Sequence, residues 1–149
     1  MADVEVSVII DRTPEQVWEY VRDISTHVEW MVDAAEIRFL SSQTEGEGTS
    51  FECDTVVGPI KLVDVMTVTS WTDGAEMGVR HDGAVTGEGV FRLRPFGSGA
   101  TEFSWRESLQ FPWWMGSRVG ARVSGPILSA IWKRNLAELK RRVEARPVT

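Results

Sequence analysis

The chain has 149 residues, of which 42% are hydrophobic and 26% charged, a balance typical of one soluble globular domain. Its formal net charge of −6 argues against general nucleic-acid binding, so we expect no nucleic-acid partner. The only cysteine, Cys53, excludes an internal disulfide and a zinc site built from several cysteines.

Two kinds of segment that would direct the protein to a membrane or out of the cell are not predicted. The first residues lack a basic segment followed by a long apolar one, so we expect no signal peptide. No run approaches about 18 consecutive apolar residues, so we expect no transmembrane helix. A cytoplasmic location follows by default.

The chain begins with a strand and two short helices. Apolar residues alternate with polar ones from Val4 to Ile10, which predicts a half-buried strand. Thr13, Pro14 and Gln16 then form the pattern of a capping box with proline at the first helical position. A second short helix is predicted from Ser25 to Met31, with inward residues Val28, Trp30 and Met31.

Strand patterns bounded by turn residues occupy the middle of the chain. Six strands are predicted, over Ile37–Phe39, Phe51–Val57, Leu62–Trp71, Met77–Val79, Phe91–Leu93 and Phe103–Leu109. The short connections between them indicate hairpins and an antiparallel meander. The sequence does not decide which face of the strand Leu62–Trp71 points inward, because apolar residues occupy both sets of alternating positions.

After Pro112 the spacing of apolar residues becomes that of an α-helix, and a long helix is predicted from Gly116 to Ala145. Its apolar stripe comprises Leu128, Ile131, Trp132, Leu136, Leu139 and Val143. Pro126 either kinks this helix or starts a second one after Gly125. The basic residues Lys133, Arg134, Lys140, Arg141 and Arg142 are interpreted as a solvated face, with a partner surface as the alternative.

These elements predict an α+β fold in which a curved antiparallel sheet of about seven strands wraps around the long C-terminal helix. At about 100° per residue, Ser117, Ala121 and Ser124 share the side that carries Leu128 and Trp132. Small residues there predict a cavity beside the first half of the helix, and a filled core is the alternative. The expected lining of the cavity or its mouth is Phe51, Cys53, Thr55, Phe103, Trp105, Trp113, Trp114, Ala121, Ser124, Leu128, Trp132 and Asn135.

Polar residues on apolar faces are the candidate functional groups. Glu107 is in register with Phe103 and Trp105, so it is a candidate general acid or base or a ligand acceptor. The alternatives are a buried partner for an arginine or a strand end that reaches water. His81 is a candidate proton shuttle or a residue at the rim, and Asn135 either binds a ligand or is a satisfied core amide.

The remaining groups suggest little chemistry. Cys53 is interpreted as a small core residue rather than a nucleophile. Trp113 and Trp114 follow a proline, in a segment that can cover a pocket mouth, touch a membrane or another subunit, or pack on the domain itself. No group of residues has metal-ligand spacing and no glycine-rich loop precedes a helix, so we expect neither a metal nor a cofactor.

Three segments together resemble a known family. They are the opening VSVIIDRTPEQVWEYVRDISTHVEW, the hairpin GVFRLRPFGSGATEFSWRESL and the closing WKRNLAELKRRVEA. They are similar to the START-like, Bet v 1-like (SRPBCC) superfamily, and within it to the bacterial polyketide cyclase/dehydrase and lipid-transport group. The resemblance implies one helix-grip domain over residues 1–146, with 147–149 as a frayed tail.

The resemblance also implies binding or carriage of an apolar small molecule of lipid, isoprenoid or quinone, or polyketide type. A polyketide cyclase or aromatase that uses Glu107 or His81 is one alternative, although neither residue matches a diagnostic catalytic pattern. An interaction module or a toxin-like member of the superfamily is the other. The sequence leaves the ligand and the oligomeric state open.

Overall fold

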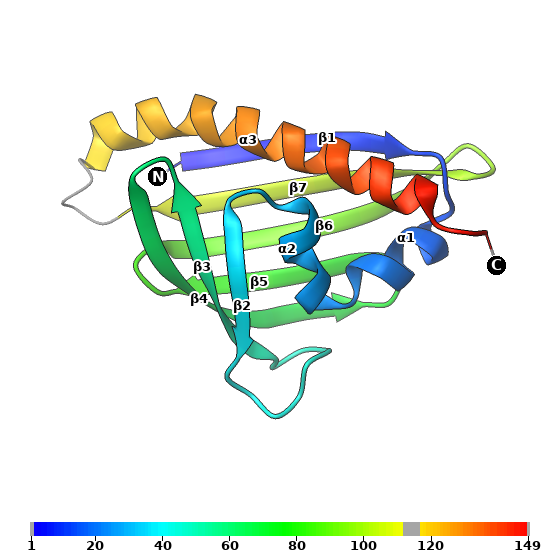
Figure 1. Cartoon of the computed structure of the whole chain (residues 1–149), viewed down its shortest axis with the longest axis horizontal. Helices are drawn as coiled ribbons and strands as arrows, with labels where there is room; N and C mark the ends of the chain where they lie inside the picture. Colours follow the sequence, from blue (N-terminus) through cyan, green and yellow to red (C-terminus); the bar gives the residue numbers. More distant parts are fainter. Residues whose placement is uncertain (1, 112–116, 149) are drawn as a thin grey trace.

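Alternating apolar residues build a seven-stranded antiparallel sheet in the order β1-β7-β6-β5-β4-β3-β2 (Figure 1). The computed structural model describes the backbone of residues 2–111 and 117–148, and the side chains of residues 3–111 and 125–148. All seven predicted strands are present: β1 Ala2–Ile10, β2 Ala34–Phe39, β3 Ser50–Val57, β4 Ile60–Thr72, β5 Glu76–Asp82, β6 Thr86–Phe96 and β7 Ala100–Gln110. Most are longer than predicted, because ladder hydrogen bonds continue past the apolar residues.

The first helix, α1 (Pro14–Val21), begins as its sequence indicates. Thr13 Oγ1 accepts a hydrogen bond from Gln16 N at 3.3 Å, and Thr13 N donates one to Gln16 Oε1 at 2.9 Å. This reciprocal pair satisfies two of the N–H groups that a helix start leaves free.

The second predicted helix divides into a 3-10 turn, η1 (Ile24–Thr26), and a single α-helical turn, α2 (His27–Trp30). Trp30 is buried as predicted, but Val28 and Met31 are only half-buried. His27 takes the inward position instead, because residues three apart share one face of a helical turn.

Strand β4 shows which of its alternating sides faces inward. Leu62, Asp64 and Met66 lie on the inner side of the sheet, whereas Val63 is 48% exposed. A register shift between Val68 and Ser70 then returns Trp71 to the inner face, where its ring lies 5.1 Å from that of Trp18 on α1. The two alternating sides of this strand are therefore exchanged part-way along its length.

The long helix, α3 (Ser117–Ala145), crosses the inner face of the sheet and packs against β1 (Figure 1). Its predicted stripe is buried except for the half-buried Ile131: Leu128, Trp132, Leu136, Leu139 and Val143 are at most 8% exposed. The helix is continuous through Pro126, so a second helix starting after Gly125 is wrong. One proline removes a single backbone hydrogen bond, and the buried stripe after it keeps the chain helical.

The basic residues of α3 lie outside this stripe. Lys133 and Arg134 are exposed, and Arg141 and Arg142 both form ion pairs with Glu138. Pairs of this kind within one helix contribute only a few tenths of a kcal/mol each. Among the described helices, none is both long enough and apolar enough to cross a bilayer.

Candidate functional site

A cavity of about 340 Å³ lies between the inner face of the sheet, α3 and the connection from α2 to β2. Its lining is mainly apolar and contains six of the predicted residues: Phe51, Cys53, Thr55, Trp105, Leu128 and Trp132. The domain is therefore hollow, as the sequence predicts. Pockets that bury small organic ligands measure about 300–1,000 Å³, so this one suits a compact ligand.

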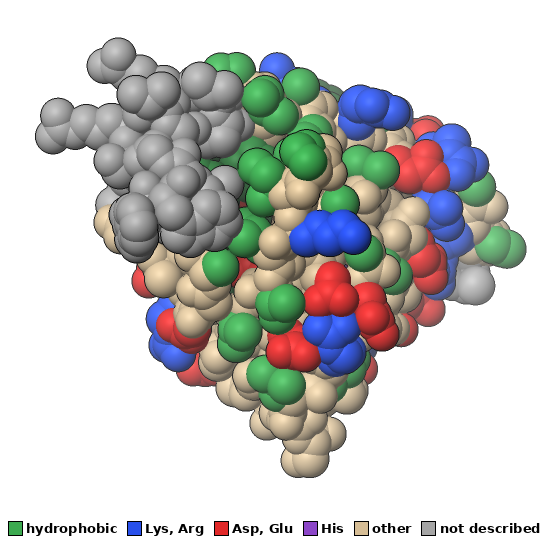
Figure 2. Space-filling model, turned by 60° about the vertical axis from the view of Figure 1, so that its left-hand side comes forward, with side chains coloured by type: hydrophobic (Ala, Val, Ile, Leu, Met, Phe, Trp, Pro, Cys, Tyr) green, Lys and Arg blue, Asp and Glu red, His purple; other side chains and the backbone are tan. Residues whose placement is uncertain are grey.

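The cavity reaches the surface between the β3–β4 hairpin and α3. Ile60 and Ile127 both line it, and they are 38% and 46% exposed. Figure 2 shows hydrophobic side chains spread over this side of the molecule, between patches of charged groups.

Two predicted residues do not line the cavity. Phe103 is fully buried and packs against Phe91, with ring centroids 5.2 Å apart. Asn135 accepts a hydrogen bond from Val32 N at 3.0 Å and donates one to Asp33 Oδ1 at 2.8 Å. Asn135 thus has its amide paired within the core and links α3 to the residues before β2, and neither residue belongs to the described lining of this cavity.

Four predicted positions fall outside the described side chains. Trp113 and Trp114 lie in the segment 112–116, and Ala121 and Ser124 belong to the described backbone of α3 only. Their part in the cavity or its mouth stays a prediction. The described part of α3 contributes Ile127, Leu128 and Trp132 to the lining, so bulky residues also border the cavity.

One wall of the cavity carries a cluster of three charged side chains, which we call the acid–imidazole cluster: Asp64, His81 and Glu107. His81 Nδ1 lies 3.1 Å from Asp64 Oδ2, and His81 Nε2 lies 3.0 Å from Glu107 Oε2. The second contact is a close ionic approach in which the N–H does not point at the oxygen well enough for a hydrogen bond. Glu107 also accepts a hydrogen bond from Trp105 Nε1 at 3.1 Å.

Strand register brings these three residues together. Met66 on β4 pairs with His81 on β5, so Asp64 is the diagonal neighbour of His81. Glu107 on β7 lies two strands from His81, with β6 between them. The β6 residues opposite His81 and Glu107 are Gly87 and Gly89, and no side chain of β6 separates the imidazole from the carboxylate.

Gly89 is the residue that makes room for Glu107. A Cβ atom at Gly89 would lie 2.6 Å from Glu107 Oε1 and 2.8 Å from its Cδ. Glycine there allows Glu107 to lie across β6 with its carboxylate beside His81. Both groups are buried, with 7% of Glu107 and 5% of His81 exposed, so they face the cavity rather than bulk water.

The charge of His81 follows from these contacts. Burial by itself lowers the pKa of the imidazole, but the contacts with Asp64 and Glu107 outweigh it and raise the pKa to about 10. His81 is therefore an imidazolium at neutral pH. The partners of Glu107 are His81 and Trp105 rather than an arginine. Glu107 and His81 are 7% and 5% exposed, so the structure places neither of them at a solvent-exposed strand end or rim.

His27 also lines the cavity, but its imidazole is neutral at pH 7, whereas that of His81 is charged. Burial lowers its pKa to about 4, and its Nε2 lies 2.9 Å from the carbonyl oxygen of Val21. The cavity thus holds one neutral and one charged histidine at pH 7.

A family model described as polyketide cyclase/dehydrase and lipid transport matches residues 1–144. The chain belongs to this family. A search of curated proteins finds no match.

Solved structures of similar fold extend this result. A Thermus thermophilus protein is 17% identical with a TM-score of 0.80, over 96% of this chain and 97% of the other. A conserved Geobacillus kaustophilus protein is 16% identical with a TM-score of 0.77, over 95% of both chains. The Zhui aromatase/cyclase from a Streptomyces species is 17% identical with a TM-score of 0.73, over 97% of this chain and 94% of that one. Such identities show a shared fold.

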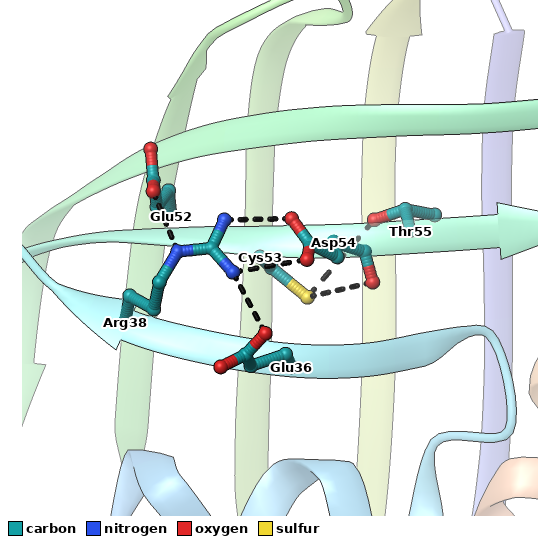
Figure 3. A network of polar contacts seen from close by, with 6 residues as sticks. All are labelled: Glu36, Arg38, Glu52, Cys53, Asp54 and Thr55. Carbon is teal, nitrogen blue, oxygen red and sulfur yellow. Dashed lines mark hydrogen bonds and ion pairs between the residues drawn. The ribbon is translucent and has the colours of Figure 1, made fainter.

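Within this family fold, Cys53 lines the cavity as a small hydrophobic residue. Burial raises the pKa of its thiol to about 12, so it is not a nucleophile at neutral pH. The neighbouring residues of β3 point outward. Arg38 on β2 bridges Glu36, Glu52 and Asp54 there (Figure 3) and lowers the pKa of Asp54 by hydrogen bonding. This outer network links the edge strand β2 to β3 on the side away from the cavity.

Sequence reasoning missed Asp64, His27 and Gly89. Asp64 was hidden because apolar residues occupy both alternating positions of β4. The available signal was Gly87 and Gly89, two glycines at alternate positions of a strand that neighbours the one with an inward glutamate. A gap of this kind on the inner face indicates that another side chain fills the space.

Neither histidine is expected to titrate between pH 5.5 and 8.5. His81 stabilises the fold fully below its ordinary pKa of 6.5, and this contribution is lost as the pH rises through about 10. His27 acts oppositely, because only the unfolded chain binds its proton as the pH falls from 6.5 towards 4. Long-range ¹H–¹⁵N spectra over this range measure both states, and His27→Gln assigns the signals. A midpoint near 6.5 for either ring contradicts the arrangement.

Proposed function

We propose that this protein binds a compact apolar molecule of polyketide, isoprenoid or quinone, or lipid type in the cavity, with its polar group against the acid–imidazole cluster. The observation that carries this proposal is a hollow of about 340 Å³ with a mainly apolar lining and the acid–imidazole cluster on one wall. An apolar interior with a few convergent polar groups is the usual design of a small-molecule site. Membership of the polyketide cyclase/dehydrase and lipid-transport family supports the same ligand class.

The charged cluster itself supports a binding role over a purely structural one. Burying ions costs free energy, and replacing a buried ion pair by apolar residues is often neutral or stabilising. A sheet that only needed a packed core would therefore gain little from three charged groups at this position. Their place in a cavity wall is what a ligand with a polar group requires.

Filling the cavity tests binding. Val79 lines the cavity, and Val79→Trp should abolish the binding of apolar probes that quench the fluorescence of Trp105 and Trp132. Val63 lies on the neighbouring strand and is 48% exposed, so Val63→Trp is the matched control that should bind as the wild type does. Native mass spectrometry with added quinones, fatty alcohols and aromatic polyketides gives an independent readout. Equal binding by both variants would place the ligand elsewhere.

The second candidate function is proton-transfer catalysis, as in a polyketide cyclase. Glu107 is a carboxylate beside an imidazolium, so it would take a proton from a carbon next to a carbonyl while His81 stabilises the resulting oxyanion. Geometry favours this pair, because both groups face one cavity and lie 3.0 Å apart. Asp64 would orient the imidazole through its contact with Nδ1.

Glu107→Gln separates the two functions. Turnover of a model poly-β-ketone is expected to fall about 100-fold or more, the lower end for a lost general base. Binding of the same compound should change far less, because glutamine keeps the shape and an acceptor oxygen. Glu52→Gln, on the outer face of β3, is the control that should keep full turnover. Unchanged turnover in the Glu107 variant would leave binding as the function.

A further inference from the structure

The charged groups that line the cavity are mostly acidic. Asp33, Asp64 and Glu107 contribute three carboxylates, and His81 is the one charged base among the lining residues that the structure describes. His27 is neutral there because burial lowers its pKa to about 4. The interior therefore has an excess of negative charge in a low-dielectric space.

Most hydrogen-bond donors of the described lining are paired with groups of the protein itself. Trp105 Nε1 donates to Glu107, and Trp132 Nε1 donates to Asp33 Oδ2 at 3.2 Å. His81 Nδ1 lies against Asp64, its Nε2 lies 3.0 Å from Glu107 without a well-aligned hydrogen bond, and the Nε2 of His27 lies against a backbone carbonyl. The Nε2 of His81 is therefore covered by a carboxylate, which a ligand acceptor or anion would have to displace.

Acceptor capacity, in contrast, is in excess. An ionised carboxylate offers about four lone-pair sites, and Glu107 uses one for Trp105 and faces His81 with another. A hydroxyl group of a ligand can therefore donate to Glu107 without displacing any contact. A ligand carboxylate would instead bury a charge beside like charges without a donor, which is costly.

Aromatic side chains next to the cluster favour a flat ring. Trp105 and Trp132 stack with ring centroids 4.5 Å apart and 17° between planes, and Phe91 meets Trp105 edge-on at 5.4 Å. All three line the cavity. Rings prefer offset-stacked or edge-on contacts with other rings, which this surface provides.

We infer that the cavity selects uncharged ring compounds that carry a hydrogen-bond-donating hydroxyl, as phenols do, and rejects carboxylates. This inference rests on the proposed function, since it names the ligand class of the same site. It makes Glu107 and Asp64 the residues that determine specificity: Glu107 accepts the hydroxyl, and Asp64 keeps His81 charged and paired.

Three naphthalenes of similar size test this inference at pH 7: 2-naphthol, 2-methoxynaphthalene and 2-naphthoate. Calorimetry should show 2-naphthol binding about 10-fold or more tightly than 2-methoxynaphthalene, as expected for a hydrogen bond to a charged acceptor. The same hydrogen bond and the repelled charge together should make 2-naphthoate at least about 100-fold weaker than 2-naphthol.

Removing the cavity charges should relax this selection. In the double variant Asp64→Asn/Glu107→Gln, the preference for 2-naphthol over 2-naphthoate should shrink about 10-fold or more. The matched control is Glu36→Gln/Glu52→Gln, which removes the same number of charges from the outer network of Arg38 and should keep the wild-type ratio (Figure 3).

The outcomes separate this inference from the function on which it rests. If 2-naphthoate binds as tightly as 2-naphthol, or the methyl ether binds equally well, the inference is overturned while apolar binding stands. If none of the three probes binds, and the quinones and fatty alcohols also fail, the proposed function falls and the inference with it. An equal change of ratio in the control variant would assign the effect to net charge and overturn the role of Asp64 and Glu107.

Discussion

His81→Gln is expected to destabilise the protein by about 3–5 kcal/mol at pH 7, the usual cost of breaking a buried ion pair from one side. Without the imidazolium, Asp64 and Glu107 face one cavity as two carboxylates with no cation between them. Urea denaturation at pH 7 measures this loss, because the midpoint shifts with the free energy of unfolding.

The matched control for this variant is charge-neutral. Asp64→Asn/His81→Gln/Glu107→Gln keeps similar shapes and removes all three charges, so it should recover most of the stability lost by His81→Gln alone. Non-additivity of this size is expected for residues in one polar network. A triple variant no more stable than the single one would mean that packing of the imidazole, rather than charge balance, is what the fold requires.

Gly89→Ala is expected to displace the Glu107 carboxylate and to weaken binding of 2-naphthol about 10-fold or more, since the hydrogen bond to a charged acceptor is lost. The added methyl group would overlap Glu107 at Oε1 and Cδ and would lie 3.2 Å from its Cγ, so the carboxylate must move. The cost in folding free energy should be about 1–3 kcal/mol, as for other overpacked cores. The pKa of His81 should also fall below about 10, because one of its carboxylate partners moves away.

Gly78→Ala is the control for this prediction. Gly78 lies on the adjacent strand β5, and an added methyl group there would meet the Oγ atom of Ser70, the end of a short rotatable side chain. It does not line the cavity, so binding of 2-naphthol and the histidine signals should stay as in the wild type. If both glycine variants bind 2-naphthol equally well, Glu107 does not act through the position that Gly89 leaves open.

The acid–imidazole cluster also explains how an apolar cavity can be selective. An apolar wall alone distinguishes ligands weakly, because an added or missing methylene changes affinity by only about 1–3 kcal/mol. A buried carboxylate held by Trp105 and His81 is pre-organised and cannot turn away from a ligand that lacks a donor. A fixed hydrogen-bond acceptor therefore distinguishes ligands more strongly than an apolar wall does, and in the inferred specificity this acceptor is Glu107.

Local patterns determined the elements of this protein. The alternation from Val4 to Ile10, the capping box at Thr13 and the stripe through Leu139 each report which side of an element is buried, and each was confirmed. The inward position of Glu107 was visible for the same reason, because its strand alternates strictly. Patterns of this kind depend only on the period of one element, which the sequence alone carries.

Only the tertiary structure decided what Glu107 faces. The partner His81 is two strands away, and Asp64 belongs to a strand whose inward side the sequence left open. Their meeting depends on the register of four strands and on the empty positions at Gly87 and Gly89. Pairing between strands is a long-range property, so no single segment contains it. The sequence predicted a curved sheet around a long helix with an inward acid and left the choice between a cavity and a filled core open, and the packing of strands placed that acid in a cavity wall beside His81.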